Sequence, residues 1–221
     1  MTAHPATYTT ALLPILASLL PAGRPLRILD PFAGTGKVAL LTAWRPGIAT
    51  YGTELEAEWA AQATARGCGT PISSALHLPY PDHMFDAIVT SPTYGNRMAD
   101  HHAARDASPR HTYRHVLGHP LHPENTGAMQ WGSLYCDFHL RAWAECRRVL
   151  QPGGLFILNI KDHIRQGVRQ PVTAWHVRAL TQLGFTELTR VAVPCPGQRH
   201  GANGQARVNH ETIIQLRACA D

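Results

Sequence analysis

Two short turns in the sequence combine residue types that could do chemistry, and each follows an apolar run typical of a buried strand. The first is DPFAGTG at residues 30–36, where the glycines permit a tight turn and a close approach of the backbone to a ligand. A helical pattern follows, so backbone N–H groups would point outward from the helix start. The spacing matches neither G-x-G-x-x-G nor a phosphate-binding P-loop. This turn alone leaves a ligand site and a packing turn both open.

An acidic residue follows the next predicted strand, at residues 50–52. Glu54 would lie beside the glycine turn, because the carboxyl ends of parallel strands meet at one edge of the sheet. A carboxylate there can accept hydrogen bonds from both hydroxyls of a ribose. The alternative is a solvated acid or a helix cap, and it applies more to Glu56, which would open the helix predicted at residues 57–66.

The second turn is TSPTYGN at residues 90–96, directly after the clearest predicted strand, residues 85–90. It places the hydroxyl of Ser91, the carbonyl of Pro92 and the ring of Tyr94 at the sheet edge where ligands are expected. The structural alternative is an ordinary turn, because Ser-Pro commonly starts turns and a tyrosine can simply pack.

Strands and helices alternate along the chain, which predicts an α/β fold: a doubly wound, mostly parallel sheet of about seven strands. We expect strands at residues 26–30, 50–52, near 71, 85–90, 155–160, 185–193 and 211–217. We expect helices at residues 36–44, 57–66, 138–149 and 172–183. The last two strands would form a hairpin, so the sheet would end antiparallel. At 221 residues, the chain fits a single domain.

Residues 95–134 interrupt this alternation and read as a substrate-binding insertion. Cations and aromatic rings are interleaved there, as suits nucleic-acid binding, starting from Asn96 and Arg97. Its histidines stand in no ligand framework with cysteines or carboxylates, so we expect no metal. A second candidate contact is Arg199 in the Gly-rich loop at residues 198–207, which reads equally well as a flexible hairpin tip.

Composition narrows the class of protein. The chain is 44% hydrophobic and 16% charged, typical of a folded globular protein, and its net charge of +5 favours an anionic partner. Five scattered cysteines without a C-x-x-C pair favour a reducing, cytoplasmic location. The apolar residues 11–20 are interrupted by Pro14, so we expect a short helix and no membrane span.

The first turn resembles the first motif of the amino-directed (cytosine-N4 / adenine-N6) DNA methyltransferases, which use S-adenosylmethionine and have a Rossmann-like fold. HPATY at residues 4–8 resembles the segment preceding that motif, which in the family lies over the methionine part of the cofactor. The resemblance implies cofactor binding by His4, Tyr8, Asp30, Phe32, Gly34, Gly36, Glu54 and Ser74. Ser74 stands where the family often has an acid that meets the adenine amino group.

The second turn resembles the family's catalytic motif, Asp/Asn/Ser-Pro-Pro-Tyr/Phe/Trp. The resemblance implies that Ser91 Oγ and the Pro92 carbonyl accept hydrogens from an exocyclic amine, and that Tyr94 stacks on a base rotated out of its helix. Thr93 replaces the second proline. The candidate substrate contacts are Thr93 in this motif and Asn96, Arg97 and Arg199 in the two loops.

DNA is the favoured substrate, and serine at the first motif position favours cytosine N4 slightly over adenine N6. A cytosine-C5 enzyme would need a cysteine at this turn, where Ser91 stands. The alternatives are an RNA (tRNA) base methyltransferase, an inactive methyltransferase-like binding subunit, and a small-molecule or protein methyltransferase. We expect no separate recognition domain, so specificity would reside in the two loops or in a partner such as an accessory subunit, or be low. A homo-oligomer is also left open.

Overall fold

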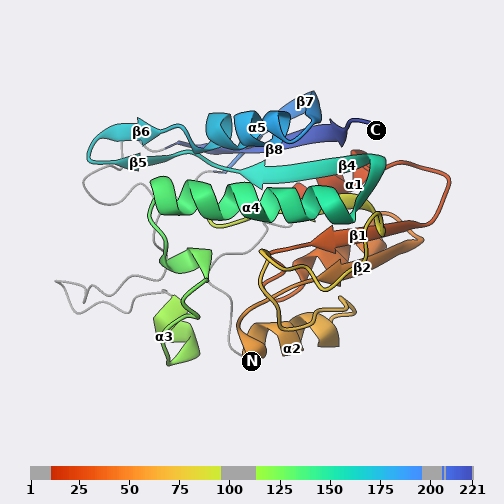
Figure 1. Ribbon diagram of the computed structural model, residues 1–221, viewed down its shortest axis with the longest axis horizontal. Coiled ribbons are helices and arrows are strands. Elements are labelled where there is room, and N and C mark those ends of the chain that lie inside the picture. The colour runs from red at the N-terminus through yellow and green to blue at the C-terminus, as the bar shows by residue number, and fades with distance from the viewer. Residues whose placement is uncertain (1–10, 96–112, 196–205, 207, 221) are drawn as a thin grey trace.

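A computed structural model describes residues 11–95, 113–195, 206 and 208–220 and shows a mixed sheet between two helical layers (Figure 1). The strand order is β2-β1-β3-β4-β8-β7. The first four strands are parallel, whereas β8 runs antiparallel to β4 and β7 antiparallel to β8. The strands are β1 Leu26–Asp30, β2 Ile48–Gly52, β3 Phe85–Thr90, β4 Leu150–Ile160, β7 Phe185–Pro194 and β8 His210–Ala218. The predicted fold class is confirmed.

Helices cover both faces of this sheet. The helices of the described residues are α1 Leu12–Ser18, η1 Lys37–Ala43, α2 Ala57–Ala65, α3 Tyr113–Leu117, η2 Thr126–Ala128, α4 Ser133–Val149 and α5 Val172–Gln182. One apolar core contains buried side chains of α4 and α5, and the other contains those of α1 and η1. In Figure 1, α4 crosses the near face of the sheet.

Alternating strand residues supply the two cores. In β3, Ile88 belongs to the core under α4, while Ala87 and Val89 belong to the core under α1. In β4, Phe156 and Ile157 divide in the same way. Both faces of a strand are apolar where helices cover both faces of the sheet, which is why these strands read as continuous hydrophobic runs.

Three local features differ from the sequence prediction. The expected strand near residue 71 pairs only through single bridges, Tyr51 to Gly69 and Glu54 to Ile72, so the main sheet has six strands. The helix expected at residues 36–44 is the 3-10 helix η1, and its first turn is closed by Ala39 N donating to Gly36 O. A small hairpin, β5 His163–Arg165 with β6 Val168–Gln170, follows β4 and was not predicted.

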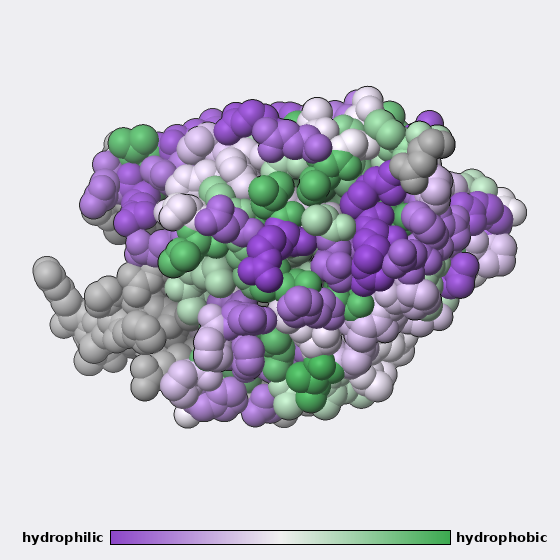
Figure 2. Space-filling view, in the orientation of Figure 1, coloured by the Kyte–Doolittle hydropathy of each residue, from purple (hydrophilic) through white to green (hydrophobic). Residues whose placement is uncertain are grey.

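The surface on the α4 side is largely hydrophilic, with small separate hydrophobic patches (Figure 2). The large apolar side chains that are exposed come from different elements, among them Trp44, Ile72, Leu134 and Val168. Among the described residues, no helix is both long and apolar enough to cross a membrane.

Candidate cofactor and substrate site

The glycine turn and the Ser-Pro turn lie at adjacent strand ends and are joined by one buried carboxylate. Asp30 is 1% exposed, and its Oδ1 accepts hydrogen bonds from Thr90 Oγ1 at 2.7 Å and from the Phe32 amide at 3.1 Å. Asp30 ends β1, and Thr90 ends β3, its parallel neighbour. Asp30 therefore fixes the spacing between the two turns, a structural contribution that its position in the motif did not reveal.

The glycine turn needs glycine for backbone conformation and for packing. Gly34 and Gly36 have φ values of 51° and 72°, in the region that disfavours residues with a Cβ. A Cβ on Gly36 would also lie 2.6 Å from Ala63 Cα of α2. The Gly36 end of the turn therefore packs against α2. Phe32, within the same turn, is partly buried.

Glu54 lies against the glycine turn, as the sequence predicted. Its Oε2 accepts from the Gly34 amide at 2.8 Å, and its Oε1 accepts from the Leu55 amide at 2.8 Å and the Glu56 amide at 3.0 Å. Burial raises the pKa of the Glu54 carboxyl from 4.5 to about 7, although these three hydrogen bonds act in the opposite direction. The carboxylate is an acceptor-only group, and its oxygens retain lone pairs for further donors.

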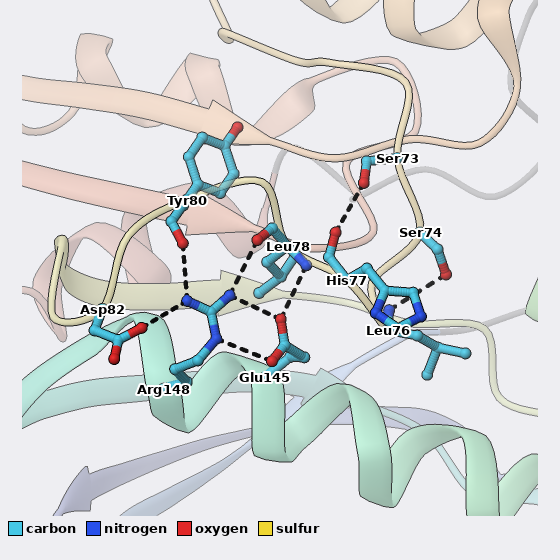
Figure 3. A network of polar contacts seen from close by, with 9 residues as sticks. All are labelled: Ser73, Ser74, Leu76, His77, Leu78, Tyr80, Asp82, Glu145 and Arg148. Carbon is cyan, nitrogen blue, oxygen red and sulfur yellow. Dashed lines mark hydrogen bonds and ion pairs between the residues drawn. The ribbon is translucent and has the colours of Figure 1, made fainter.

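Ser74 lies in a segment that is tied to α4 by ion pairs and carbonyl contacts (Figure 3). Arg148 is the centre of this network and donates to the carbonyls of Leu78 and Tyr80 and to the carboxylates of Asp82 and Glu145. Ser74 Oγ accepts from the Leu76 amide at 3.3 Å, and the Ser73 amide donates to Glu54 O. Ser74 therefore belongs to a segment that hydrogen bonds hold to α4 at residues 78–82 and to Glu54 at Ser73.

The Ser-Pro turn holds its polar groups close together. Ser91 Oγ and Tyr94 Oη are 3.2 Å apart, and Asn159 Nδ2 at the end of β4 lies 3.2 Å from Ser91 Oγ. Burial raises the pKa of Tyr94 far above its ordinary value, with the Glu211 carboxylate as a second cause, so its hydroxyl stays protonated. Sequence reasoning missed Asn159 and Glu211. The available signal was a single polar residue, Asn159, inside an apolar strand.

A directed chain of hydrogen bonds holds the backbone of Thr93. Trp143 Nε1 can only donate, so His176 Nδ1, at 3.0 Å, accepts and the neutral ring carries its hydrogen on Nε2. His176 Nε2 then donates to Tyr135 Oη at 2.9 Å, and Tyr135 donates to the Thr93 carbonyl at 2.6 Å. Burial lowers the pKa of His176 well below its ordinary value, which keeps the ring neutral. Thr93 Oγ1 also donates to Thr126 Oγ1 at 2.8 Å.

The described end of the predicted insertion is hydrogen-bonded to Glu56. Glu56 precedes α2, as expected, and its Oε1 accepts from the His122 amide at 2.9 Å and from Asn125 Nδ2 at 2.8 Å. Asn125 Oδ1 in turn accepts from the Gly127 amide and caps η2. Residues 122–125 therefore lie against the residue that precedes α2.

Five predicted site residues lie outside the described residues: His4, Tyr8, Asn96, Arg97 and Arg199. The structure brings together the other ten, Asp30, Phe32, Gly34, Gly36, Glu54, Ser74, Ser91, Pro92, Thr93 and Tyr94, on turns that follow the carboxyl ends of β1, β2 and β3 and the bridged segment beside β2. Within the described part of the chain, no group of three or more His, Cys, Asp or Glu side chains has a metal-binding arrangement.

The fold is that of the S-adenosylmethionine-dependent methyltransferases. A methyltransferase from Methanosarcina mazei has a TM-score of 0.60 and 15% identity over 94% of this chain and 98% of its own. The [4+2]-cyclase SpnF has a TM-score of 0.61 and 19% identity over 96% of this chain and 82% of its own. Because one of these proteins is a cyclase, the fold alone does not fix the reaction.

The family model described as DNA methylase (N6/N4) matches residues 85–219, from β3 to the end of β8. The chain belongs to this family of S-adenosylmethionine-dependent methyltransferases, and S-adenosylmethionine is its cofactor. The tRNA1(Val) (adenine(37)-N6)-methyltransferase of Yersinia enterocolitica is 31% identical over 91 residues, 36% of this chain and 36% of that relative. The similarity to this relative thus spans about a third of its length.

Proposed function

We propose that the chain transfers the methyl group of S-adenosylmethionine to the exocyclic amino group of a nucleic-acid base, with DNA as the favoured substrate. The observation that carries the proposal is the hydrogen bond between Thr90 and Asp30. It holds Ser91 and Pro92 next to the glycine turn, so an amine bound at one turn would face a methyl donor bound at the other. The family match includes the Ser-Pro turn.

The cofactor would be held at the first turn. Gly34, Gly36 and Phe32 would contact its methionine side, with His4 and Tyr8 as the proposed cover. Glu54 would accept hydrogens from the ribose hydroxyls, and Ser74 Oγ would accept one from the adenine amino group. The acceptor-only carboxylate of Glu54 at the turn fits this group. When bound, S-adenosylmethionine supplies an electrophilic methyl group.

The second turn would prepare the amine. An exocyclic amino nitrogen is a poor nucleophile, because its lone pair is delocalised into the base. Accepting its hydrogens at Ser91 Oγ and the Pro92 carbonyl draws the nitrogen toward tetrahedral geometry and aims the lone pair at the methyl group. Tyr94 would stack on the base, and Thr93, Asn96, Arg97 and Arg199 would contact the substrate.

Cytosine N4 is the favoured target because serine begins the motif, with adenine N6 second. A tRNA base is the second candidate substrate, and the observation that favours it is the similarity to the Yersinia tRNA adenine-N6 methyltransferase. An inactive subunit that binds the cofactor is the third reading.

The test is transfer of labelled methyl from S-adenosylmethionine to DNA and to tRNA, with mass analysis of the released nucleosides. Ser91→Ala should abolish transfer, whereas Ser133→Ala, at an exposed serine of α4, should not. N4-methylcytosine or N6-methyladenine in DNA supports the proposal. Label confined to tRNA supports the second candidate, and cofactor binding without transfer to either supports the inactive subunit.

A further inference from the structure

Asn159 is a buried polar residue placed next to the Ser-Pro turn. It is 1% exposed and lies between the apolar residues Leu158 and Ile160 of β4. Leu158 pairs with Thr90 of β3, so Asn159 and Ser91 follow at neighbouring strand ends. On its other side Asn159 pairs with Ile213 of β8. The sheet therefore directs this amide to the edge that holds the proposed catalytic motif.

The orientation of the Asn159 amide is fixed by a carboxylate. Its Nδ2 has two hydrogens: one is donated to Glu211 Oε2 at 2.8 Å, and the other is shared between Ser91 Oγ at 3.2 Å and Tyr94 Oη at 3.4 Å. An ionised carboxylate only accepts, so the opposite amide orientation would place Asn159 Oδ1 against Glu211 Oε2, two acceptors in contact. Glu211 therefore determines which end of the amide faces β8.

This orientation leaves an acceptor unused. Asn159 Oδ1 is buried and has no hydrogen-bond partner among the described residues. An unpaired buried acceptor is unfavourable unless a ligand supplies a donor. Asn159 Nδ2 also occupies one lone pair of Ser91 Oγ, which reduces the capacity of that hydroxyl to accept hydrogens from a substrate amine.

We propose that Asn159 Oδ1 accepts a hydrogen from the exocyclic amino group of the target base, and that Glu211 is the positioning residue that orients the amide. The inference rests on the proposed function and adds a third acceptor to Ser91 Oγ and the Pro92 carbonyl. The contacts of Asn159 Nδ2 with Ser91 and Tyr94 place the side chain beside the two motif residues that would meet the base. The ligand chemistry is a planar amine with two N–H donors, one of which would be shared between two of the three acceptors.

The test compares binding of the target base with binding of the same base lacking its amino group, 2-pyrimidinone for cytosine or purine for adenine. Oligonucleotides carrying either base are titrated in the presence of S-adenosylhomocysteine, in the nucleic acid that the methylation assay identifies. Asn159→Leu removes the acceptor, and Asn159→Ser replaces the carbonyl with a shorter hydroxyl that retains a donor for Glu211. Glu211→Gln frees the amide orientation. Glu187→Gln, in an exposed pair with Arg190 on β7, is the matched control.

In the Asn159 variants the preference for the amino-bearing base should fall about 10-fold, and kcat should fall by at least as much. In both, KM for S-adenosylmethionine should stay near the wild-type value. Glu211→Gln should give a smaller loss of the same kind, and Glu187→Gln none. Asn159→Ser keeps the test open if Asn159→Leu does not fold.

An unchanged preference in a folded Asn159 variant overturns the inference while leaving the proposed function intact. An equal loss of cofactor affinity also overturns it, because Oδ1 would then meet the cofactor. Wild-type protein that methylates neither DNA nor tRNA overturns the proposed function itself, and the inference with it.

Discussion

Replacing Glu54 with glutamine should weaken cofactor binding and remove its dependence on pH. The side chain keeps its size, and the carboxylate that would meet the ribose loses its charge. Burial raises the pKa of Glu54 to about 7, so at pH 6 only about one tenth of the unliganded protein carries the ionised group. Cofactor binding favours the ionised form, because an ionised carboxylate accepts hydrogen bonds more strongly and has no hydrogen of its own in the way.

The magnitude follows from the hydrogen bonds that the charge strengthens. A hydrogen bond to a charged group contributes about 1.5–3 kcal/mol, which corresponds to about 10- to 100-fold in Kd. The wild-type Kd for S-adenosylhomocysteine should therefore rise by about 10- to 100-fold as pH falls from 7 to 5 and then level off. Glu54→Gln should bind with the weak affinity of the low-pH wild type at every pH.

The pH dependence of the free energy of unfolding is an independent check on the raised pKa of Glu54. A carboxyl whose pKa is raised on folding binds its proton more tightly in the folded state, so the free energy of unfolding falls as pH rises from about 4.5 to 7. A rise in pKa from 4.5 to about 7 corresponds to about 3 kcal/mol. Urea unfolding of unliganded wild type should show this loss relative to Glu54→Gln.

Calorimetric titration of the ligand between pH 5 and 8.5, with both proteins, measures the first effect. The ionisable groups of the ligand affect both proteins equally, so the difference between the two curves reports Glu54. The reasoning is refuted if the wild-type Kd is constant below pH 7, or if Glu54→Gln follows the same pH curve as the wild type.

Three further substitutions test the parts that hold the site. Gly36→Ala should lower the free energy of unfolding by about 2 kcal/mol or more, because φ is 72° and the new Cβ would lie 2.6 Å from Ala63 Cα; an unchanged urea midpoint would contradict this. Tyr135→Phe leaves the Thr93 carbonyl without its donor and should lower stability by about 1–3 kcal/mol and reduce kcat without changing cofactor affinity. Full activity in that variant would show that the hydrogen-bond chain does not position the turn. Asp30→Ala should weaken S-adenosylhomocysteine binding, measured by calorimetry, since Thr90 and the Phe32 amide both lose their acceptor; wild-type affinity would count against the bridge between the turns.

The sequence predicted most elements because their signals are local. The strands at residues 26–30 and 85–90 were bounded correctly, since an apolar run ending at a turn motif marks both ends. The hairpin of β5 and β6 was missed because its strands are short and polar. The helix expected at residues 36–44 is the 3-10 helix η1, and an apolar pattern does not distinguish the two helix types.

The sequence by itself determined the family resemblance, the two turns and the acid beside them. Each of these motifs is a short contiguous stretch next to a strand end, so it can be recognised without knowledge of the tertiary structure. A parallel sheet then brings strand ends to one edge without further information. The tertiary structure decided the hydrogen-bonded partners of the second turn. Asn159 and Glu211 are separated by 52 positions, and Tyr135 and His176 by 41. Contacts between residues so far apart depend on strand register and helix packing. Register and packing are determined by the burial of both sheet faces, to which residues along the whole chain contribute together.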